Sequence, residues 1–357
     1  MRRVETIFII LALAFYAWFL THFGFRETLG YLRLAGWGLA VTIALEAIAR
    51  AANAVGWRVT IEHYPPSLSF FELYAARIGG EAIDYTTPSA QLGGQFVMAL
   101  MVRRKLRMPV GLATVAVSAL AEGIGQITFI TLALVLASGL IPAAAGLLWP
   151  IVAGFLIAAA MLCGFLFVQM KRPFRHLWRF AAKLDLSRFD TSELGESADE
   201  ADAILLDFYR RHRGRLILSC LCFLVAWSLG PIEIYILLRL LHQPATVRVA
   251  ILVEALGLLI ERATFLIPAK LVSQEGGKAL ILGLLGYPPG AGFAVGFLRR
   301  IKEMVWVMFG LVALMIHRAI ERGGIGVAAA AAPGLQAPAP KAGEILEIRQ
   351  AQGEQSL

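Results

Sequence analysis

The run GIGQITFITLALVLASGLIPAAAGLLWPIVAGFLIAAAMLCGFLFVQM, residues 123–170, decides the fold. It holds 48 residues and contains no Asp, Glu, Lys or Arg. A membrane-spanning helix needs about 20 apolar residues, so this run is long enough for two crossings. The sequence Ile141-Pro142-Ala143 lies between them, and its proline favours a break at that point.

The rest of the chain has the same character. Of its 357 residues, 58% are hydrophobic and 16% are charged, against about 45–50% and about 25% in soluble domains. This composition excludes a soluble, a disordered or a disulfide-scaffold protein. The net charge of +8 comes from Lys and Arg in short loops beside apolar runs, which is typical of membrane topology rather than of nucleic-acid binding. The three cysteines cannot pair off and lie in apolar runs at Cys163, Cys220 and Cys222.

The sequence predicts an all-α integral membrane protein with about six full transmembrane helices. The second helix is unusual because it contains Glu46 and Arg50 four residues apart, and the fifth is interrupted by Gly230-Pro231. The six predicted crossings are Thr6–Thr21, Leu34–Trp57, about Pro109–Leu140, about Leu148–Met170, Leu216–Leu240 and Pro289–His317.

Two further stretches, Ser67–Val102 and Val247–Tyr287, consist of two short apolar segments each, with Pro88 or Pro268 at the centre. Such interrupted segments predict re-entrant or broken hairpins. Their non-helical turns can exist at membrane depth only where protein or water satisfies the backbone. We therefore expect hinges in these turns, at Pro88, Gly93, Gly94, Pro268, Gly276 and Gly277.

The basic loops set the expected orientation. Placing every one of them in the cytoplasm gives a consistent alternation, with both termini cytoplasmic in a bacterial inner membrane. The loops are Met1–Arg3, Arg103–Arg107, Lys171–Lys183, Arg210–Arg215 and Arg318–Arg322. The predicted organisation is a membrane domain over 1–322, with a cytoplasmic loop over 171–215, and a disordered tail rich in Ala, Pro, Gly and Gln over 323–357.

Within the cytoplasmic loop, Lys171–Leu186 predicts an interfacial helix. Phe174, Leu177, Trp178 and Ala181 share one face, and basic residues line the others. Such a helix suits an anionic leaflet, although a role as a topology anchor alone is an equal alternative. We expect the acidic segment Asp185–Asp207 that follows to be solvated.

A shift of 180 residues aligns the two hairpins. Pro88 then falls on Pro268, Pro109 on Pro289, and Glu81 on Glu261. This pattern predicts a structural repeat, with one copy over about 34–140 and the other over about 214–318. Three full crossings lie between the hairpins, and an odd number reverses the second copy. Inverted repeats are typical of transporters, whose sites lie near the midplane between the copies.

Charged residues at membrane depth are costly and therefore need partners or water. One hypothesis is mutual ion pairing that only holds the bundle together, as in the four-residue spacings of Arg77 with Glu81 and of Arg299 with Glu303. The other is a hydrated cavity for a lipid headgroup. The excess of Lys and Arg around the second hairpin favours an anionic group. The candidate binding residues are Arg77, Glu81, Asp84, Gln95, Lys270, Glu275, Lys278, Arg299, Arg300 and Glu303.

The sequence lacks the motifs that indicate nucleotide or metal chemistry. It contains no GxxxxGK[ST] loop and no HExxH motif, and its six histidines are scattered. We therefore expect no nucleotide motor, no metal and no cofactor.

Each predicted hairpin contains a proline followed by a short glycine-containing motif. In the first, the motif is Pro88-Ser-Ala-Gln-Leu-Gly93-Gly94-Gln95, and in the second it runs from Pro268 to Gly277. These motifs resemble those of the flippase-like membrane domain of lysylphosphatidylglycerol synthases and its stand-alone relatives. The first matches a proline followed by a Gly-Gly-Glu-like turn, with Gln in place of the acid, and the second matches a proline followed by Glu-Gly, with Lys270 and Ser273 in place of the usual glycines.

The segments Gly286-Tyr-Pro288-Pro289 and Arg299-Arg300-Ile-Lys302-Glu303 look most like the members associated with hopanoid biosynthesis. The resemblance covers about residues 1–320. It implies lipid translocation between leaflets and no aminoacyl transfer, because the synthases carry that activity on a large soluble domain.

Three functions remain open at this point. The first is a flippase-like transporter of a polar-headgroup lipid that works without being an enzyme, with Glu275 and Glu81 as candidate proton-linked carboxylates. On this hypothesis, Glu275→Gln should abolish transport and leave folding intact. The second is a membrane enzyme acting on a lipid headgroup, with Asp84 or Glu81 as the base. The third is a non-catalytic subunit of a lipid or hopanoid pathway, which docks a biosynthetic enzyme through Lys171–Leu186.

Overall fold

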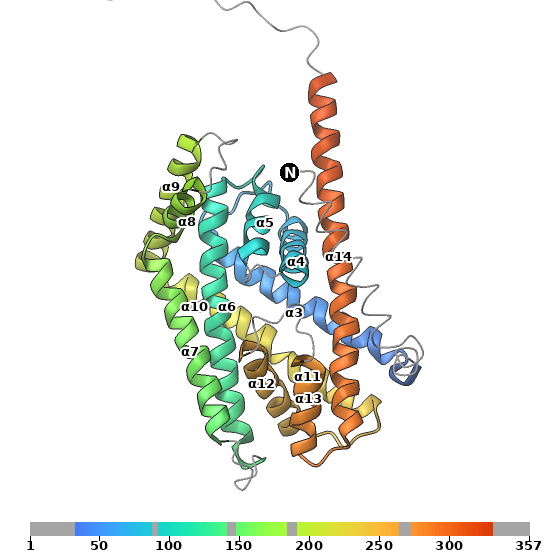
Figure 1. Ribbon diagram of the computed structural model, residues 1–357. Helices are drawn as coiled ribbons and strands as arrows, with labels where there is room; N and C mark the ends of the chain where they lie inside the picture. Colours follow the sequence, from blue (N-terminus) through green and yellow to red (C-terminus); the bar gives the residue numbers. More distant parts are fainter. Residues whose placement is uncertain (1–32, 88–91, 141–147, 184–190, 264–272, 331–357) are drawn as a thin grey trace, which may run out of the picture. The chain divides into compact units, whose positions relative to one another are not determined.

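The structure is a computed structural model that describes residues 33–87, 92–140, 148–183, 191–263 and 273–330. This part of the chain consists of helices and connecting turns, and contains no strand (Figure 1). The prediction of an all-α integral membrane protein is confirmed. The helices are α3 Gly38–Thr60, α4 Phe70–Thr86, α5 Leu92–Val102, α6 Met108–Ala137, α7 Leu148–Met170, α8 Pro173–Lys183, α9 Thr191–Arg211, α10 Arg213–Ser228, α11 Gly230–Leu240, α12 Val247–Ala263, α13 Ser273–Leu284 and α14 Pro289–Ala330.

Five helical segments among the described residues are long and apolar enough to cross a membrane. They match five of the six predicted crossings, while Thr6–Thr21 lies outside the described residues. The predicted interruption at Gly230-Pro231 is confirmed, because α10 ends at Ser228 and α11 begins at Gly230. The five segments are Gly38–Thr60, Met108–Ala137, Ile151–Met170, Arg213–Leu240 and Gly290–Ile320.

Both predicted hairpins are pairs of short helices. α4 has 17 residues and α5 has 11, and α12 has 17 residues and α13 has 12. A capping box starts α4, in which Ser69 and Glu72 satisfy each other's backbone N–H groups. The turn prolines Pro88 and Pro268 lie outside the described residues.

The bases of the two hairpins lie at opposite ends of α3 (Figure 1). The first base follows the end of α3 closely and is joined by Lys105, whose Nζ contacts Glu72 Oε1 at 2.7 Å. The second base follows α11, whose Leu240 packs against the start of α3 at Gly38. Here the Tyr287 hydroxyl donates to the Pro244 carbonyl at 2.7 Å. The two bases lie at opposite ends of the bundle, the first beside the start of α6 and the second beside the start of α14 (Figure 1).

Glycines let the hairpin helices touch backbone to backbone. A Cβ on Gly94 of α5 would lie 2.3 Å from the Gly80 carbonyl oxygen of α4. On α14, a Cβ on Gly292 would lie 2.5 Å from the Lys278 carbonyl oxygen of α13. Neither position can accept a side chain without moving the backbone beside it.

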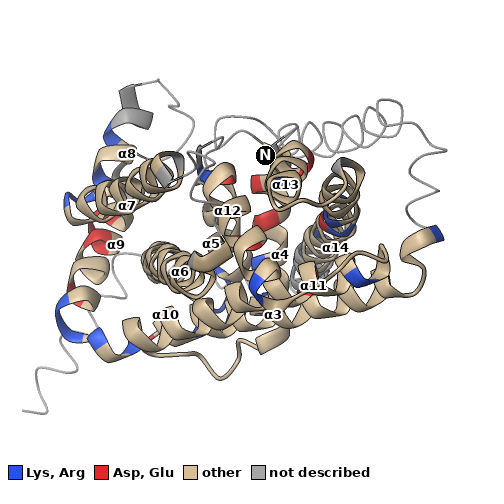
Figure 2. Ribbon diagram, turned by 90° about the horizontal axis from the view of Figure 1, so that it is seen from below, with Lys and Arg blue, Asp and Glu red and all other residues tan. Residues whose placement is uncertain are grey.

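Contacts gather three basic segments at one end of the bundle. Arg107 pairs with Glu200 of α9 at 2.8 Å, and Arg175 of α8 pairs with Asp199 of α9 at 3.3 Å. Arg215, at the start of α10, donates to the Ile61 carbonyl just after α3 at 3.0 Å. Figure 2 shows the corresponding concentration of basic residues around α8, the end of α9 and the start of α10.

The segment following the interfacial helix differs from the prediction. Instead of being solvated, residues 191–211 form α9, which buries Ala201, Leu205 and Phe208. Asp202 is also buried and accepts the backbone N–H groups of Phe174 at 3.2 Å and of Arg175 at 3.0 Å, which caps α8. Burial raises the pKa of Asp202, and the two N–H donors oppose that shift.

The predicted apolar face of α8 is partly covered by protein. Phe174 packs into the cluster formed by α6 and α9, and Trp178 lies against Gly195 of α9. Leu177 keeps 57% of its surface exposed. The helix itself is confirmed as Pro173–Lys183, and two residues of its apolar face, Phe174 and Trp178, contact α9.

The chain divides into two compact units, Met1–Leu314 and Met315–Leu357. Within the second, α14 continues to Ala330, so the predicted tail beginning at Gly323 is wrong over its first eight residues. The reason is composition, because the segment ends in a run of alanines from Ala328, the residue with the highest helix propensity. Residues 331–357 lie outside the described residues.

Candidate functional site

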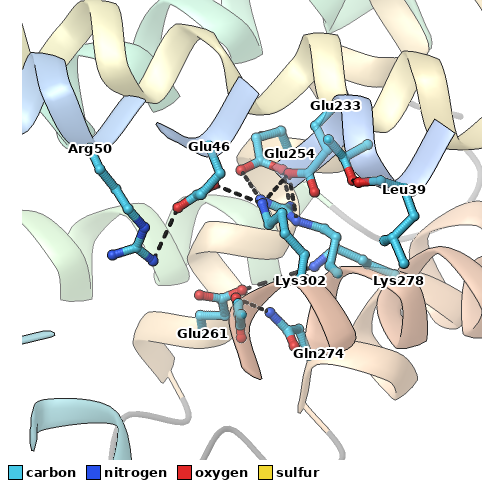
Figure 3. A network of polar contacts seen from close by, with 12 residues as sticks. Leu39, Glu46, Arg50, Glu233, Glu254, Glu261, Gln274, Lys278 and Lys302 are labelled. Atoms are coloured by element: carbon cyan, nitrogen blue, oxygen red, sulfur yellow. Dashed lines mark hydrogen bonds and ion pairs between the residues drawn. The ribbon is translucent and has the colours of Figure 1, made fainter. Parts of the chain in front are cut away.

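Nine charged side chains form a continuous chain of ion pairs inside the first unit. They come from six helices, including α4 of the first hairpin and α12 of the second. Figure 3 shows the central part of this ion-pair chain. In order of contact, its members are Glu122, Arg77, Glu81, Arg50, Glu46, Lys302, Glu233, Arg299 and Glu254.

The end at the first hairpin is built on Arg77 of α4. Its Nε donates to Glu81 Oε1 at 2.8 Å, and its Nη2 donates to Glu122 Oε2 of α6 at 2.7 Å. Glu81 turns its other oxygen to Arg50 of α3, which also contacts Glu46 Oε1 at 3.2 Å. Arg50 lies over the ring of Trp306, 5.0 Å from the centroid, an arrangement in which the ring attracts the cation.

The end at the second hairpin is built on α14. Lys302 Nζ donates to Glu46 Oε2 and to Glu233 Oε2 of α11, both at 2.7 Å. Arg299 lies 3.2 Å from Glu233 and holds both carboxylate oxygens of Glu254 on α12. Gly230 gives the Glu254 carboxylate its space, because a Cβ there would lie 2.5 Å from Oε1.

A second group of contacts surrounds the start of α13. Arg300 of α14 binds both carboxylate oxygens of Glu275 through Nε and Nη2. Gln274 donates to Glu303 Oε1 at 2.6 Å, and Lys278 lies 3.9 Å from Glu261. α13 is thus fastened to α14 by two neighbouring polar pairs.

Burial differs along these chains of charges. Near the first hairpin, the side chains of Glu46, Glu81 and Glu122 are 24%, 27% and 26% exposed, whereas the charges near the second hairpin are deeply buried. Arg300 is 0% exposed, Lys278 1%, Lys302 2%, and Glu233 and Glu275 3% each. Buried charges are tolerated only when they are paired and hydrogen-bonded, which explains why the groups form chains rather than isolated residues.

The charge balance removes the reason for expecting an anionic ligand. The ion-pair chain contains five carboxylates and four cations. The basic residues near the second hairpin are balanced by the carboxylates of α12 together with Glu46 of α3 and Glu233 of α11, and the local sequence count did not include these last two. A headgroup that enters this region must therefore compete with ion pairs that already exist.

Two of the predicted helical pairs have different outcomes. The pairing of Arg77 with Glu81 is confirmed. The pairing of Arg299 with Glu303 is wrong, because Arg299 faces Glu254 and Glu233 while Glu303 faces Gln274.

The other predicted positions are only partly brought together. Asp84 of α4 accepts the backbone N–H of Gly94 at 2.8 Å, which joins the two helices of the first hairpin, α4 and α5. Gln95, the next residue of α5, is not joined to the ion-pair chain by any contact among the described residues. Lys270 lies outside them. The predicted hinge glycines lie in the first turns of α5 and α13, at Gly93, Gly94, Gly276 and Gly277.

The prediction left six of the nine members of the ion-pair chain out of the site: Glu46, Arg50, Glu122, Glu233, Glu254 and Lys302. Their signal was present, because each is a charged residue inside a predicted crossing or hairpin. The selection favoured residues near the two prolines, and therefore missed the helices that connect the hairpins. Among the described residues, no group of His, Cys, Asp and Glu side chains is placed to hold a metal ion.

Comparison with known proteins identifies the family. The family model described as "Lysylphosphatidylglycerol synthase TM region" matches residues 6–311. No curated protein and no solved structure matches the chain. The match covers most of the chain, including both hairpins and the ion-pair chain. The protein therefore belongs to the lysylphosphatidylglycerol synthase transmembrane region family.

Proposed function

We propose that this protein moves a polar-headgroup lipid between the two leaflets of a bacterial inner membrane. The observation that carries the proposal is an ion-pair chain, buried around Lys302 and Glu233 and partly buried around Glu46 and Glu81, between two short hairpins whose bases lie at opposite ends of the bundle. Polar side chains at membrane depth are costly and are retained where a polar solute must pass. Membership of a family named for the synthesis of a membrane lipid supports a lipid as that solute.

The route follows from the chemistry of the two parts of a lipid. The headgroup needs polar partners, which Glu46, Arg50, Glu233, Lys302 and their neighbours provide once a hairpin moves. The acyl chains can stay in the bilayer beside the apolar outer faces of the bundle. Because the sequence contains no nucleotide-binding loop, we propose that movement is downhill or driven by an ion gradient.

We further propose that the two halves are inverted repeats. The hairpin helices have nearly equal lengths, 17 and 11 residues against 17 and 12. Their packing is also similar. Ala99 of α5 lies against Gly111 of α6, and Ala279 of α13 lies against Gly292 of α14. Entry from opposite sides is the relation that an inverted repeat requires.

The basic end described above sets the proposed orientation. Lys and Arg are concentrated in cytoplasmic loops of inner-membrane proteins, so we propose that the end holding α8, α9 and the base of the first hairpin is cytoplasmic. The transported lipid in this proposal includes hopanoids as a candidate class. The alternative proposal is a non-catalytic membrane subunit of a lipid or hopanoid pathway. Neither proposal requires enzyme activity.

The test is lipid movement in proteoliposomes. The purified protein is reconstituted with a fluorescent phospholipid or a fluorescent hopanoid, and dithionite quenches only the probes in the outer leaflet. Protein-free vesicles should lose about half of the signal, and vesicles with active protein should lose nearly all of it. If quenching stops at half for every lipid tested, the transport proposal is wrong.

Glu200→Gln provides a matched control. Glu200 lies on α9 in an exposed pair with Arg107, outside the ion-pair chain, and this variant should move lipid like the wild type. Loss of movement in this control as well as in core variants would mean that the assay reports reconstitution rather than the core.

A further inference from the structure

We propose that Lys278 of α13 binds the phosphate of the headgroup that this protein moves. The inference rests on the proposed function and deepens it, because it names a phosphate-bearing lipid as the substrate class and one side chain as its anchor. Lys278 is not a member of the ion-pair chain, so the charge balance of that chain does not include it.

Lys278 differs from the other buried cations in its hydrogen bonds. Four basic side chains are buried among the described residues: Arg77, Lys278, Arg300 and Lys302. Arg77, Arg300 and Lys302 each donate to a carboxylate oxygen at 2.7 Å. The carboxylate nearest to Lys278 Nζ in the described part of the chain is that of Glu261, at 3.9 Å (Figure 3), which is too far for a hydrogen bond. The ammonium therefore has three N–H donors without an acceptor among the described residues.

The first hairpin indicates that packing does not require a lysine here. The shift of 180 residues places Lys278 on Met98 of α5. Met98 is buried and packs against Gly80 of α4, where a Cβ would lie 2.4 Å from Met98 Cγ. An unbranched apolar side chain thus fills the corresponding place, and it avoids the cost of burying an ammonium without hydrogen bonds.

The same shift indicates which cation Lys278 replaces. Arg77 falls on Gly257 of α12, and Glu81 falls on Glu261. In the first hairpin, Arg77 donates to Glu81 at 2.8 Å. In the second, Lys278 Nζ reaches from α13 to 3.7 Å from the position of a Cβ on Gly257, beside Glu261. Both hairpins therefore place a cation next to the equivalent glutamate, but only the first brings the two within hydrogen-bonding distance.

Arg77 also has a second partner that the second hairpin does not reproduce. It donates to Glu122 of α6 at 2.7 Å, whereas the shift places Glu122 on Lys302, a cation. Of the two carboxylates that bind Arg77, only one has a counterpart near Lys278, and that one stays 3.9 Å away. An anion that enters with the substrate would supply the acceptor that the first hairpin obtains from its own carboxylates.

A phosphate fits this position by charge and by place. The phosphodiester of a lipid headgroup carries a single negative charge, which matches one lysine, and an ammonium binds phosphate oxygens as a compact point charge. Lys278 lies five residues after Ser273 and six before Leu284 on α13. It is therefore in the middle of the hairpin helix, which a headgroup crossing the bundle has to pass. Free phosphate has the same chemistry, and the test separates it from the lipid.

The test is phospholipid binding to the full-length protein in detergent, with Lys278→Met as the variant. Met occupies the corresponding place in the first hairpin and removes a buried charge that holds no hydrogen bond, so the melting temperature should not fall. The affinity for dihexanoyl phosphatidylglycerol, measured by microscale thermophoresis, should weaken about tenfold or more. A dihexanoyl glucolipid without a phosphate should bind the wild type and the variant equally. Glu200→Gln, from an exposed pair, should bind both lipids like the wild type.

Four outcomes would overturn the inference. Lys278→Met binds phosphatidylglycerol as tightly as the wild type, or it loses both lipids alike. Its melting temperature falls, which would make the lysine a structural residue. The wild type binds inorganic phosphate and not the phospholipid, which would make the ligand a free anion. Binding needs no transport, so lysine-dependent binding without lipid movement in vesicles would overturn the proposed function and leave this inference standing.

Discussion

Replacing Glu275 by Gln should destabilise the protein as well as disturb transport. Glu275 binds Arg300 through both carboxylate oxygens, and their side chains are 3% and 0% exposed. Removing one partner of such a pair leaves the other charge buried without its carboxylate, which costs about 3–5 kcal/mol. At about 2–4 °C per kcal/mol, the melting temperature should fall by roughly 6–20 °C.

The double variant Glu275→Gln/Arg300→Gln separates burial from function. Two neutral side chains can remain in the same space without an unpaired charge, so most of the lost stability should return. Thermal unfolding in detergent, followed by intrinsic fluorescence, measures all three variants. Glu200→Gln, from an exposed pair, should change stability by no more than about 1 kcal/mol. A Glu275→Gln protein as stable as the wild type, or a double variant less stable than either single one, would refute the reasoning.

This result changes how Glu275 is used as a probe of transport. The sequence alone led us to expect that Glu275→Gln would leave folding intact. With its partner Arg300 fully buried, loss of lipid movement in that variant is informative only when its melting temperature is known. The double variant is the better test of whether the carboxylate itself takes part.

The remaining predictions concern two glycines in helices and the buried Asp202. Gly94→Ala should lower stability by about 1–3 kcal/mol in the same unfolding assay, because its Cβ would lie 2.2 Å from Asp84 Oδ2 and 2.3 Å from the Gly80 carbonyl oxygen. Gly283→Ala, at a helical position with open space around it, should instead be neutral or stabilising. Burial raises the pKa of Asp202 above its value in the unfolded chain, which is about 4. The folded state is therefore favoured when Asp202 is protonated, and this contribution to stability is lost as the pH rises above that value. Asp202→Asn should remove this slope from melting temperatures measured across mildly acidic pH.

Hydropathy and the positions of the prolines were sufficient to predict the membrane crossings and the two hairpins. Uninterrupted apolar runs gave the crossings, and the short segments around Pro88 and Pro268 gave the hairpins. The pair of Arg77 and Glu81 was also within reach, since a four-residue spacing places two side chains on one helical face. The buried stripe of α9 could have been found as well, because Ala198, Ala201, Leu205 and Phe208 recur at helical spacing.

The ion pairs between different helices could not be predicted from the sequence. Lys302 and Glu46 are 256 residues apart, and Arg299 and Glu254 are 45 apart. Which cation meets which carboxylate depends on helix rotation and tilt, and many combinations satisfy the same composition. For that reason the local excess of Lys and Arg near the second hairpin suggested an anionic ligand, although distant carboxylates balance it.

The most direct measurement is lipid movement with the first hairpin locked. In a variant lacking the native cysteines, Ala99→Cys and Gly111→Cys would join α5 to α6, since the two Cβ positions lie 3.4 Å apart, close to the range of a disulfide. Our account predicts that dithionite quenching stops at the outer leaflet in the oxidised protein and proceeds beyond it after reduction. Each single-cysteine variant should be active in both states. Equal lipid movement with the disulfide closed and open would contradict the claim that the hairpins move to let a headgroup pass.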